Sequence, residues 1–129
     1  KSEPSNWSWK DQVREKVTIW DGVRNYQAAN NLIKMKKGDL SFFYHSVKEK
    51  QIVGIVEIYK EFYPDPTDET NKFVAVDVKT VKHLKNPVNL EKIKSTKSLI
   101  NLPLIKQSRL SVMPLNKKEW DIIIKISNQ

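Results

Sequence analysis

The sequence contains no cysteine, which excludes disulfide bonds and thiolate metal sites. A chain without disulfides suits a reducing compartment, and we expect the cytoplasm of a bacterium or, for a eukaryotic source, the nucleus. No apolar run approaches the roughly 20 residues of a membrane-spanning helix, since the longest run near the C-terminal end is Ile122–Ile124. We therefore expect no membrane partner.

Linkers, repeats and catalytic motifs are also missing. No Gly/Ser-rich stretch, internal repeat or low-complexity tract divides the 129 residues, so we expect one domain over residues 1–129. No GxSxG, HExxH, P-loop or zinc-deaminase pattern occurs. The two histidines, His45 and His83, have no acidic cluster near them in the sequence. We therefore assign no catalytic residue, no metal site and no cofactor.

Acidic residues are few, with 15 Asp and Glu against 23 Lys and Arg, and the formal net charge is +8. Residues 79–109 hold one acid, Glu91, against eight basic residues: Lys79, Lys82, Lys85, Lys92, Lys94, Lys97, Lys106 and Arg109. Phosphate backbones are the polyanions that such a segment attracts, because binding releases condensed counterions. The alternative is a set of solvated, lysine-rich loops.

Three segments carry the start signals of short helices. The first covers 9–16 and follows Ser8, the second follows Asn25, and the last follows Asn116. Asp11 and Glu119 lie three residues after the first and last of these caps, and they complete capping boxes.

Strands are predicted where β-branched and aromatic residues gather. Val17–Trp20 is extended, and Leu40–Val47, Ile52–Tyr59 and Phe73–Val81 follow as strands. We expect residues 84–106 to be irregular, with a helical turn after residue 89, and a last strand over Arg109–Met113. The sum is an α+β, β-rich fold with a curled sheet and short flanking helices.

The most informative stretch is Trp-Asp-Gly-Val-Arg-Asn-Tyr-Gln, residues 20–27, which joins a strand end to a helix start. Backbone N–H groups at such a junction are unpaired and can bind an anion. Gly22 permits a positive φ or a close backbone approach. Arg24 can meet a phosphate or stack on a base, and Trp20 and Tyr26 supply flat apolar surfaces. The alternative is a packed corner with a structural tryptophan.

Two further segments mix aromatic or apolar residues with single polar ones. Phe42–Ser46 places aromatic residues on both faces of a strand, and its Phe43 and His45 face could line a cavity. Arg109 is a single charge in an otherwise apolar segment, so it requires a carboxylate inside the protein or a phosphate outside it.

Six segments together resemble the EVE domain family in order and spacing, over essentially the whole chain. They are Lys1–Pro4, Trp20–Ala28, Phe42–Ser46, Val53–Ile55, Tyr63–Thr67 and Arg109–Pro114. The resemblance implies a PUA-like pseudobarrel of about five to six mixed strands with flanking short helices. It also implies a reader module that binds DNA or RNA and accepts a flipped, modified base, with modified cytosines favoured. The sequence does not determine the oligomeric state, and we favour a monomer.

Carried over residue by residue, the resemblance implies a base pocket of Ser2, Glu3, Trp20, Gly22, Val23, Asn25, Tyr26, Tyr44, His45, Ser46, Arg109 and Ser111. It assigns phosphate binding to Arg24, together with the lysines Lys79, Lys82, Lys85, Lys92, Lys94 and Lys97. A base outside its stack is read by aromatic sandwiching and by hydrogen bonds to its edge.

Two departures from the family pattern stand out. The short apolar strand that usually precedes Lys-Ser-Glu-Pro is not in the given sequence, so we expect the domain to lack its first few residues here, and Ala29 stands where an arginine is common. Two other functions stay open. One is an enzyme acting on a modified nucleobase or nucleotide, with His45 or Glu3 as proton carrier. The other is a sensor of free nucleosides.

Overall fold

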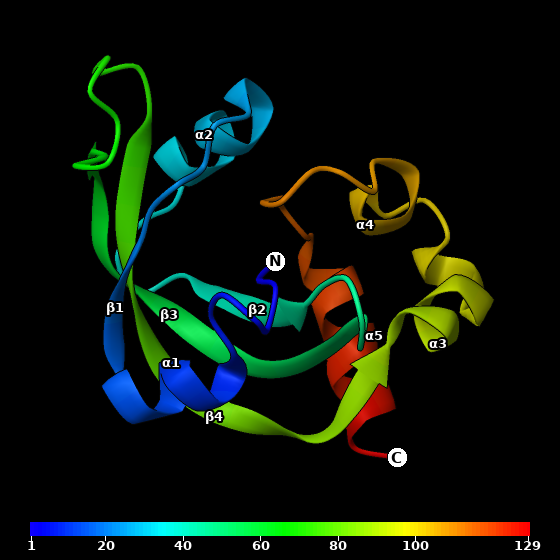
Figure 1. Cartoon of the computed structure of the whole chain (residues 1–129). Helices are drawn as coiled ribbons and strands as arrows, with labels where there is room; N and C mark the ends of the chain where they lie inside the picture. Colours follow the sequence, from blue (N-terminus) through cyan, green and yellow to red (C-terminus); the bar gives the residue numbers. More distant parts are fainter.

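A long antiparallel hairpin of β3 (Gln51–Pro64) and β4 (Val74–Asn89) forms the frame of the fold. The computed structural model describes all residues from Lys1 to Gln129. The shorter strands β1 (Val17–Trp20) and β2 (Leu40–His45) pair antiparallel with β4 and β3, giving the sheet order β1-β4-β3-β2. Repeated register shifts between β3 and β4 bend the hairpin, because each bulge adds twist. The result is the curled sheet of Figure 1.

The α+β class is confirmed, but the sheet has four strands where five to six mixed ones were expected. Residues 109–113 form no strand, because their backbone groups bond outside a ladder. The Leu110 N–H donates to the Gln107 carbonyl, and the Val112 carbonyl accepts from the Asn31 side chain. One parallel bridge, between Ser2 and His45, is the sole trace of mixed pairing.

The hairpin is longer than its sequence pattern predicted. β4 continues through residues 84–89, which we expected to be irregular because of Pro87. The β3 partners of this stretch are Gly54 for His83 and Ile52 for Val88, with a register shift between them. Pro87 therefore lies at an irregularity, where a missing N–H donor breaks no ladder bond.

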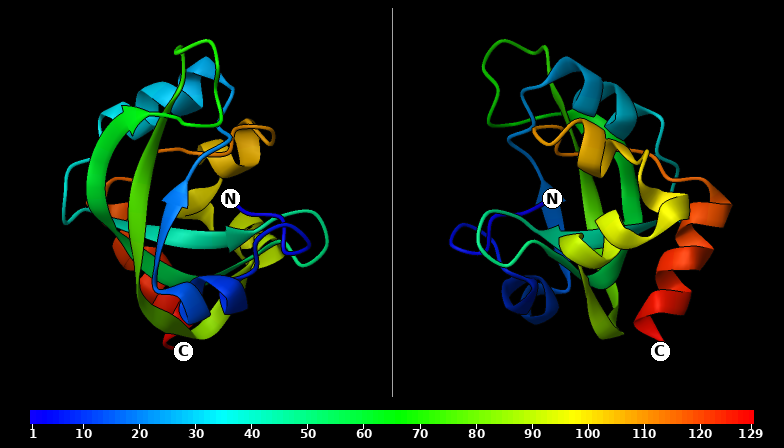
Figure 2. Two further views of the ribbon diagram at one scale, coloured as in Figure 1. Left: turned by 60° about the vertical axis from the view of Figure 1, so that its left-hand side comes forward. Right: turned by 90° about the vertical axis from the view of Figure 1, so that its right-hand side faces the viewer.

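The three predicted helices are confirmed with their caps. They are α1 (Trp9–Glu15), α2 (Tyr26–Ile33) and α5 (Lys117–Ser127). Asn89 caps α3 (Leu90–Ser95), which is the helical turn expected after residue 89 and is followed by η1 (Lys97–Leu99) and α4 (Pro103–Lys106). In Figure 2 α1 and α5 lie on opposite sides of the curled sheet. None of the helices is long and apolar enough to traverse a bilayer.

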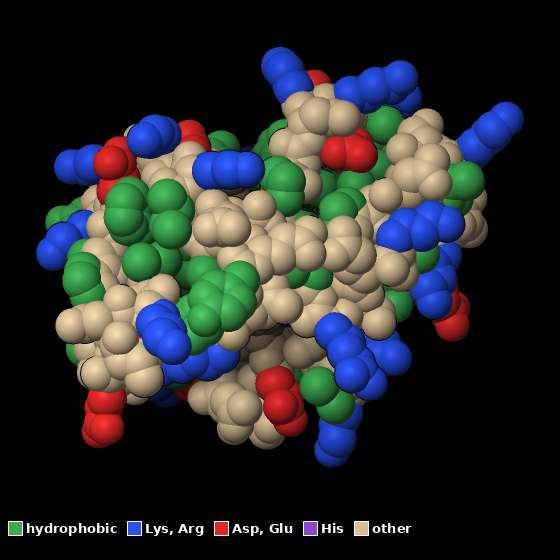
Figure 3. Space-filling view, turned by 90° about the horizontal axis from the view of Figure 1, so that it is seen from above, with side chains coloured by type: hydrophobic (Ala, Val, Ile, Leu, Met, Phe, Trp, Pro, Cys, Tyr) green, Lys and Arg blue, Asp and Glu red, His purple; other side chains and the backbone are tan.

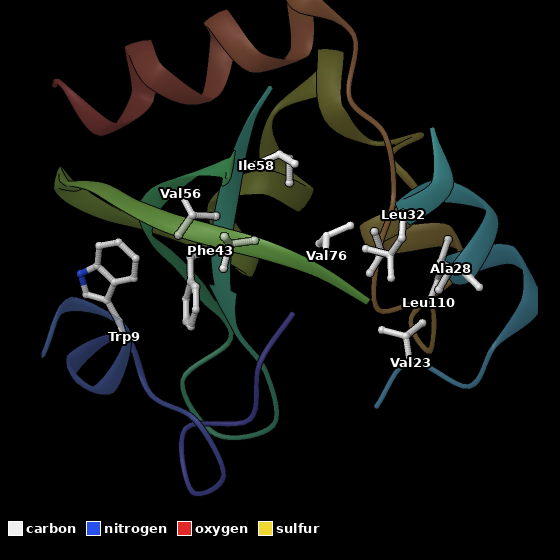
Figure 4. Close-up of a cluster of buried hydrophobic side chains, with 12 residues drawn as sticks. Trp9, Val23, Ala28, Leu32, Phe43, Val56, Ile58, Val76 and Leu110 are labelled. Carbon is white, nitrogen blue, oxygen red and sulfur yellow. The ribbon is translucent and has the colours of Figure 1, made fainter. Parts of the chain in front are cut away.

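The core consists of two clusters, one on each part of the curled sheet. The larger joins α1 and α2 to the sheet, and Figure 4 shows Trp9 and Phe43 at one end and Ala28, Leu32 and Leu110 at the other. The smaller packs α3, η1 and α5 on β2, β3 and the end of β4. Burying each large apolar side chain contributes about 1.5–3 kcal/mol.

Trp9 connects α1 to three strands. Its backbone N–H donates to Nε2 of His45 at 2.9 Å, and its indole N–H donates to Nδ1 of His83 at 2.7 Å. The ring packs directly over Gly54, where a Cβ atom would overlap it. Glycine is therefore required at this position by the close approach of the indole.

Candidate functional site

The junction between β1 and α2 is held by one buried carboxylate, Asp65. Its Oδ2 accepts from the Gly22 backbone N–H at 2.8 Å and from Nη1 of Arg24 at 2.9 Å. Its Oδ1 accepts from the Thr67 backbone N–H at 2.7 Å, and Thr67 in turn accepts from Nη2 of Arg24. Gly22 has φ +78, which suits a residue without a Cβ. The corner is therefore fixed from the loop that follows β3.

Asp65 is ionised well below neutral pH. Burial is the largest single influence and raises its pKa, but the hydrogen bonds from Thr67, Arg24 and Gly22 outweigh burial together. The net effect lowers the pKa of Asp65 to about 2. Because the carboxylate side chain is fully buried, its charge depends on these donors. Arg24, which was predicted to bind phosphate, is paired with Asp65 while 41% of its side chain stays exposed.

The N-terminal segment joins the end of β2. The Ser2 backbone N–H donates to the Tyr44 carbonyl at 2.7 Å, and the Ser46 N–H donates to the Ser2 carbonyl at 2.8 Å. His45 accepts from Trp9 at Nε2, and its Nδ1 lies 3.0 Å from Glu49. The structure thus brings together four predicted pocket residues, Ser2, Tyr44, His45 and Ser46, although both ring nitrogens of His45 already have partners.

A hollow of about 710 Å³ opens between β2, α2, α5 and the 111–117 loop. Trp20, Tyr44 and Ser111 are the predicted pocket residues that line it, and they come from three separate segments. Trp20 stands edge-on to Phe43 with 5.7 Å between ring centroids. Most lining residues are hydrophobic, so the wall of the hollow is mainly apolar. Figure 3 shows a face with hydrophobic patches and with Lys and Arg side chains around its edge.

The other predicted pocket residues lie outside the hollow. Val23 is buried in the larger core cluster, and the Asn25 side chain caps α2 by accepting from the Ala28 N–H. Glu3 and Arg109 are exposed, and so is Tyr26, which packs on Phe73. The predicted set is therefore not gathered in one place: some members line the hollow, others lie at the β1–α2 corner or where the N-terminal segment meets the end of β2, and Glu3 and Arg109 are exposed.

The predicted phosphate-binding lysines are exposed but do not line the hollow. They extend along β4, α3 and η1: Lys79, Lys82, Lys85, Lys92, Lys94 and Lys97. Three lysines that the sequence analysis did not assign to phosphate do line it, namely Lys1, Lys34 and Lys117. Lys34 is the C-cap of α2 and follows Asn31 by three residues, so helical spacing could have placed both on the same side.

Asp65 is the other residue that sequence reasoning missed. It lies in the Tyr-Pro-Asp-Pro-Thr segment, which has the composition of a turn and is one of the segments that resemble the family, but no role was assigned to Asp65 itself. No group of three His, Asp or Glu side chains in the chain is placed to hold a metal ion.

Comparisons with known proteins match the whole domain. Thymocyte nuclear protein 1 from Gallus gallus is 39% identical over 136 residues, with 88% of this chain and 56% of that protein covered. The chain therefore spans little more than half the length of this relative.

Solved structures agree with this match. Rpa0253 from Rhodopseudomonas palustris is 47% identical with a TM-score of 0.93, covering 98% of this chain and 89% of that one. The human THYN1 protein in complex with 5-methylcytosine-containing DNA is 36% identical with a TM-score of 0.86, covering 93% and 85%. A family model described as the EVE domain matches residues 1–126, and the chain belongs to this family.

Proposed function

We propose that the protein is a monomeric reader that binds DNA or RNA and holds a flipped, modified base at one end of the hollow. The supporting observation is that Trp20, Tyr44 and Ser111, which come from three segments of the chain, all line this hollow. The likeness to a human structure that contains 5-methylcytosine DNA favours a modified cytosine. The animal relatives are named nuclear proteins, which supports a nuclear location for a eukaryotic source.

The chemistry of these three side chains suits a pyrimidine. The Trp20 indole supplies a stacking face, and stacking on an aromatic side chain is worth about 1–3 kcal/mol per base. The Tyr44 and Ser111 hydroxyl groups can bond to the base edge. A methyl group buried against the apolar wall adds about 0.8 kcal/mol, so we expect methylated cytosine to bind about fourfold more tightly than cytosine.

Trp20→Ala tests the base pocket, and Trp120→Ala is its matched control. Both indoles line the hollow, but Trp120 stacks on Phe42 at 3.8 Å, within the smaller core cluster. We expect Trp20→Ala to retain most affinity for unmodified oligonucleotides and to lose the preference for modified cytosine. Trp120→Ala should lower the melting temperature and keep that preference. A folded Trp20→Ala protein that ranks modified bases like the wild type would refute the pocket.

The same binding assay separates the two other functions. Turnover of a modified oligonucleotide, lost on replacement of His45 or Glu3, would indicate an enzyme. Binding of a free nucleoside that persists at high salt would indicate a nucleoside sensor, because phosphate contacts are weakened by salt.

A further inference from the structure

A second aromatic surface lies outside the hollow, at the start of α2. Tyr26 is 64% exposed, and its ring packs beside Phe73 with centroids 5.0 Å apart and planes tilted by 31°. The Arg24 guanidinium lies 5.5 Å from the centroid of the Phe73 ring. We call Tyr26, Phe73 and Arg24 the Tyr26 platform. It joins the β1–α2 corner to the loop that follows β3, which lies beside α2 in Figure 1.

Core packing accounts for Phe73 but not for Tyr26. Phe73 is half-buried and packs against the larger core cluster. Tyr26 contributes nothing to that cluster, and its hydroxyl group makes no hydrogen bond within the chain. Phe73 supports one side of the Tyr26 ring and leaves most of it open. An exposed, supported aromatic ring is the element on which proteins stack a nucleobase.

The cation in the platform is held in place. Asp65 and Thr67 accept from Nη1 and Nη2 of Arg24, so the guanidinium has a fixed position. Asp65 offsets much of its charge, so Arg24 acts as a flat, cationic stacking group rather than as a free anion binder. This arrangement favours a π-system such as a base over an acidic peptide.

The platform lies a short distance from the proposed base pocket. Trp20 pairs with Val76 in the sheet, and Phe73 precedes Val76 by three residues. Three residues of extended chain span about 10 Å. This length corresponds to about three stacked base steps of 3.4 Å each. A strand whose modified base occupies the pocket can therefore reach the platform with a base a few nucleotides away.

We propose that the Tyr26 platform stacks an unpaired base of the strand that carries the modified base, within about three nucleotides of it. This inference rests on the proposed reader function. The inference requires that the nucleic acid be single-stranded, or that its duplex be opened locally beyond the flipped base. The platform adds affinity without reading the modification, because every base offers a π-face.

Tyr26→Ala tests the platform by fluorescence anisotropy on single-stranded oligonucleotides with and without 5-methylcytosine. Affinity for both should fall by the same factor, about 5- to 150-fold, and Tyr26→Phe should restore it. Tyr59→Ala is the control, because Tyr59 is also exposed with a lysine, Lys37, over its ring but does not line the hollow. This control should bind like the wild type.

Abasic substitution locates the stacked base. In the wild type, removal of one base within three nucleotides of the modified position should cost as much as Tyr26→Ala, and the two losses should not add. Additive losses, or equal effects of Tyr26→Ala and Tyr59→Ala, would overturn the platform. Loss of the modification ratio in Tyr26→Ala would place Tyr26 in the pocket instead. A wild type that binds without preference for 5-methylcytosine would overturn only the reader function, whereas a wild type that binds no oligonucleotide would overturn both.

Discussion

Removing the Asp65 carboxylate should destabilise the domain more than any other change in its loop. Asp65→Ala leaves the Gly22 N–H and the Arg24 guanidinium without their acceptor in a buried corner. Breaking a buried pair costs about 3–5 kcal/mol, and the partial exposure of Arg24 favours the lower figure. For a domain of this size, about 3 kcal/mol corresponds to a fall of about 10 °C in melting temperature, measured by circular dichroism.

The acid dependence of stability gives an independent check. The pKa of Asp65 is lowered to about 2 in the folded protein, below its ordinary value of 3.8. Its contribution is therefore complete above pH 4 and is lost as the pH falls through about 2. Asp65→Asn keeps the side-chain volume but cannot titrate. The difference in unfolding free energy between wild type and Asp65→Asn should shrink between pH 4 and pH 2.

Asp68 provides the matched control for this experiment. Its carboxylate also accepts backbone N–H groups of the same loop, from Thr70, Lys72 and Phe73, but it lies nearer the surface and pairs with no arginine. Asp68→Ala should lower the melting temperature less than Asp65→Ala. An Asp65→Ala protein that melts within 2 °C of the Asp68→Ala protein would show that the corner does not depend on the buried carboxylate.

Three further outcomes are expected. Gly54→Ala should prevent Trp9 from packing on the sheet, and such overpacking lowers the free energy of unfolding by about 1–3 kcal/mol. Denaturant titrations measure this loss, and an unfolding midpoint equal to that of the wild type would refute the contact. Ser127→Ala removes both hydrogen bonds between the Ser127 hydroxyl and the Asn86 backbone. The free energy of unfolding should fall by about 1–2 kcal/mol in the same assay, and a smaller loss would mean that packing alone anchors α5. A third variant replaces Lys92, Lys94 and Lys97 with glutamine. It should weaken the binding of all oligonucleotides by a similar factor, and on single strands the slope of log affinity against log salt should flatten by about 0.7 per lost contact. Unchanged affinity would show that these lysines only solvate the surface.

Local signals predicted the helices well, because the capping residues act within one turn. Ser8, Asn25 and Asn116 begin their helices where the sequence indicated, and Asn89 begins α3. Strand ends were less predictable, since bulges let β3 and β4 continue through positions that would end a regular strand. The segment around Arg109 has the composition of a strand, but it lies against α2 and the N-terminus instead. Its conformation depends on tertiary partners that no local pattern contains.

The candidate site was predictable only in part, because it too depends on contacts between distant segments of the chain. The family motifs pointed to Trp20, Tyr44 and Ser111, which the fold brings to one hollow. Asp65 lies about forty positions from Arg24 in the sequence, and nothing local to either residue indicated that they pair. Long-range pairs of this kind are visible only once the chain is folded.

The two hydrogen bonds from Trp9 impose a rule on both histidines of the chain. His45 and His83 each accept a hydrogen bond from this residue, through Nε2 and Nδ1 respectively. Position 83 therefore requires a side chain with an acceptor atom, which glutamine offers and which lysine and arginine lack. The attachment of α1 to the strands therefore depends on an acceptor nitrogen at two separate places, His45 for the backbone N–H and His83 for the indole N–H.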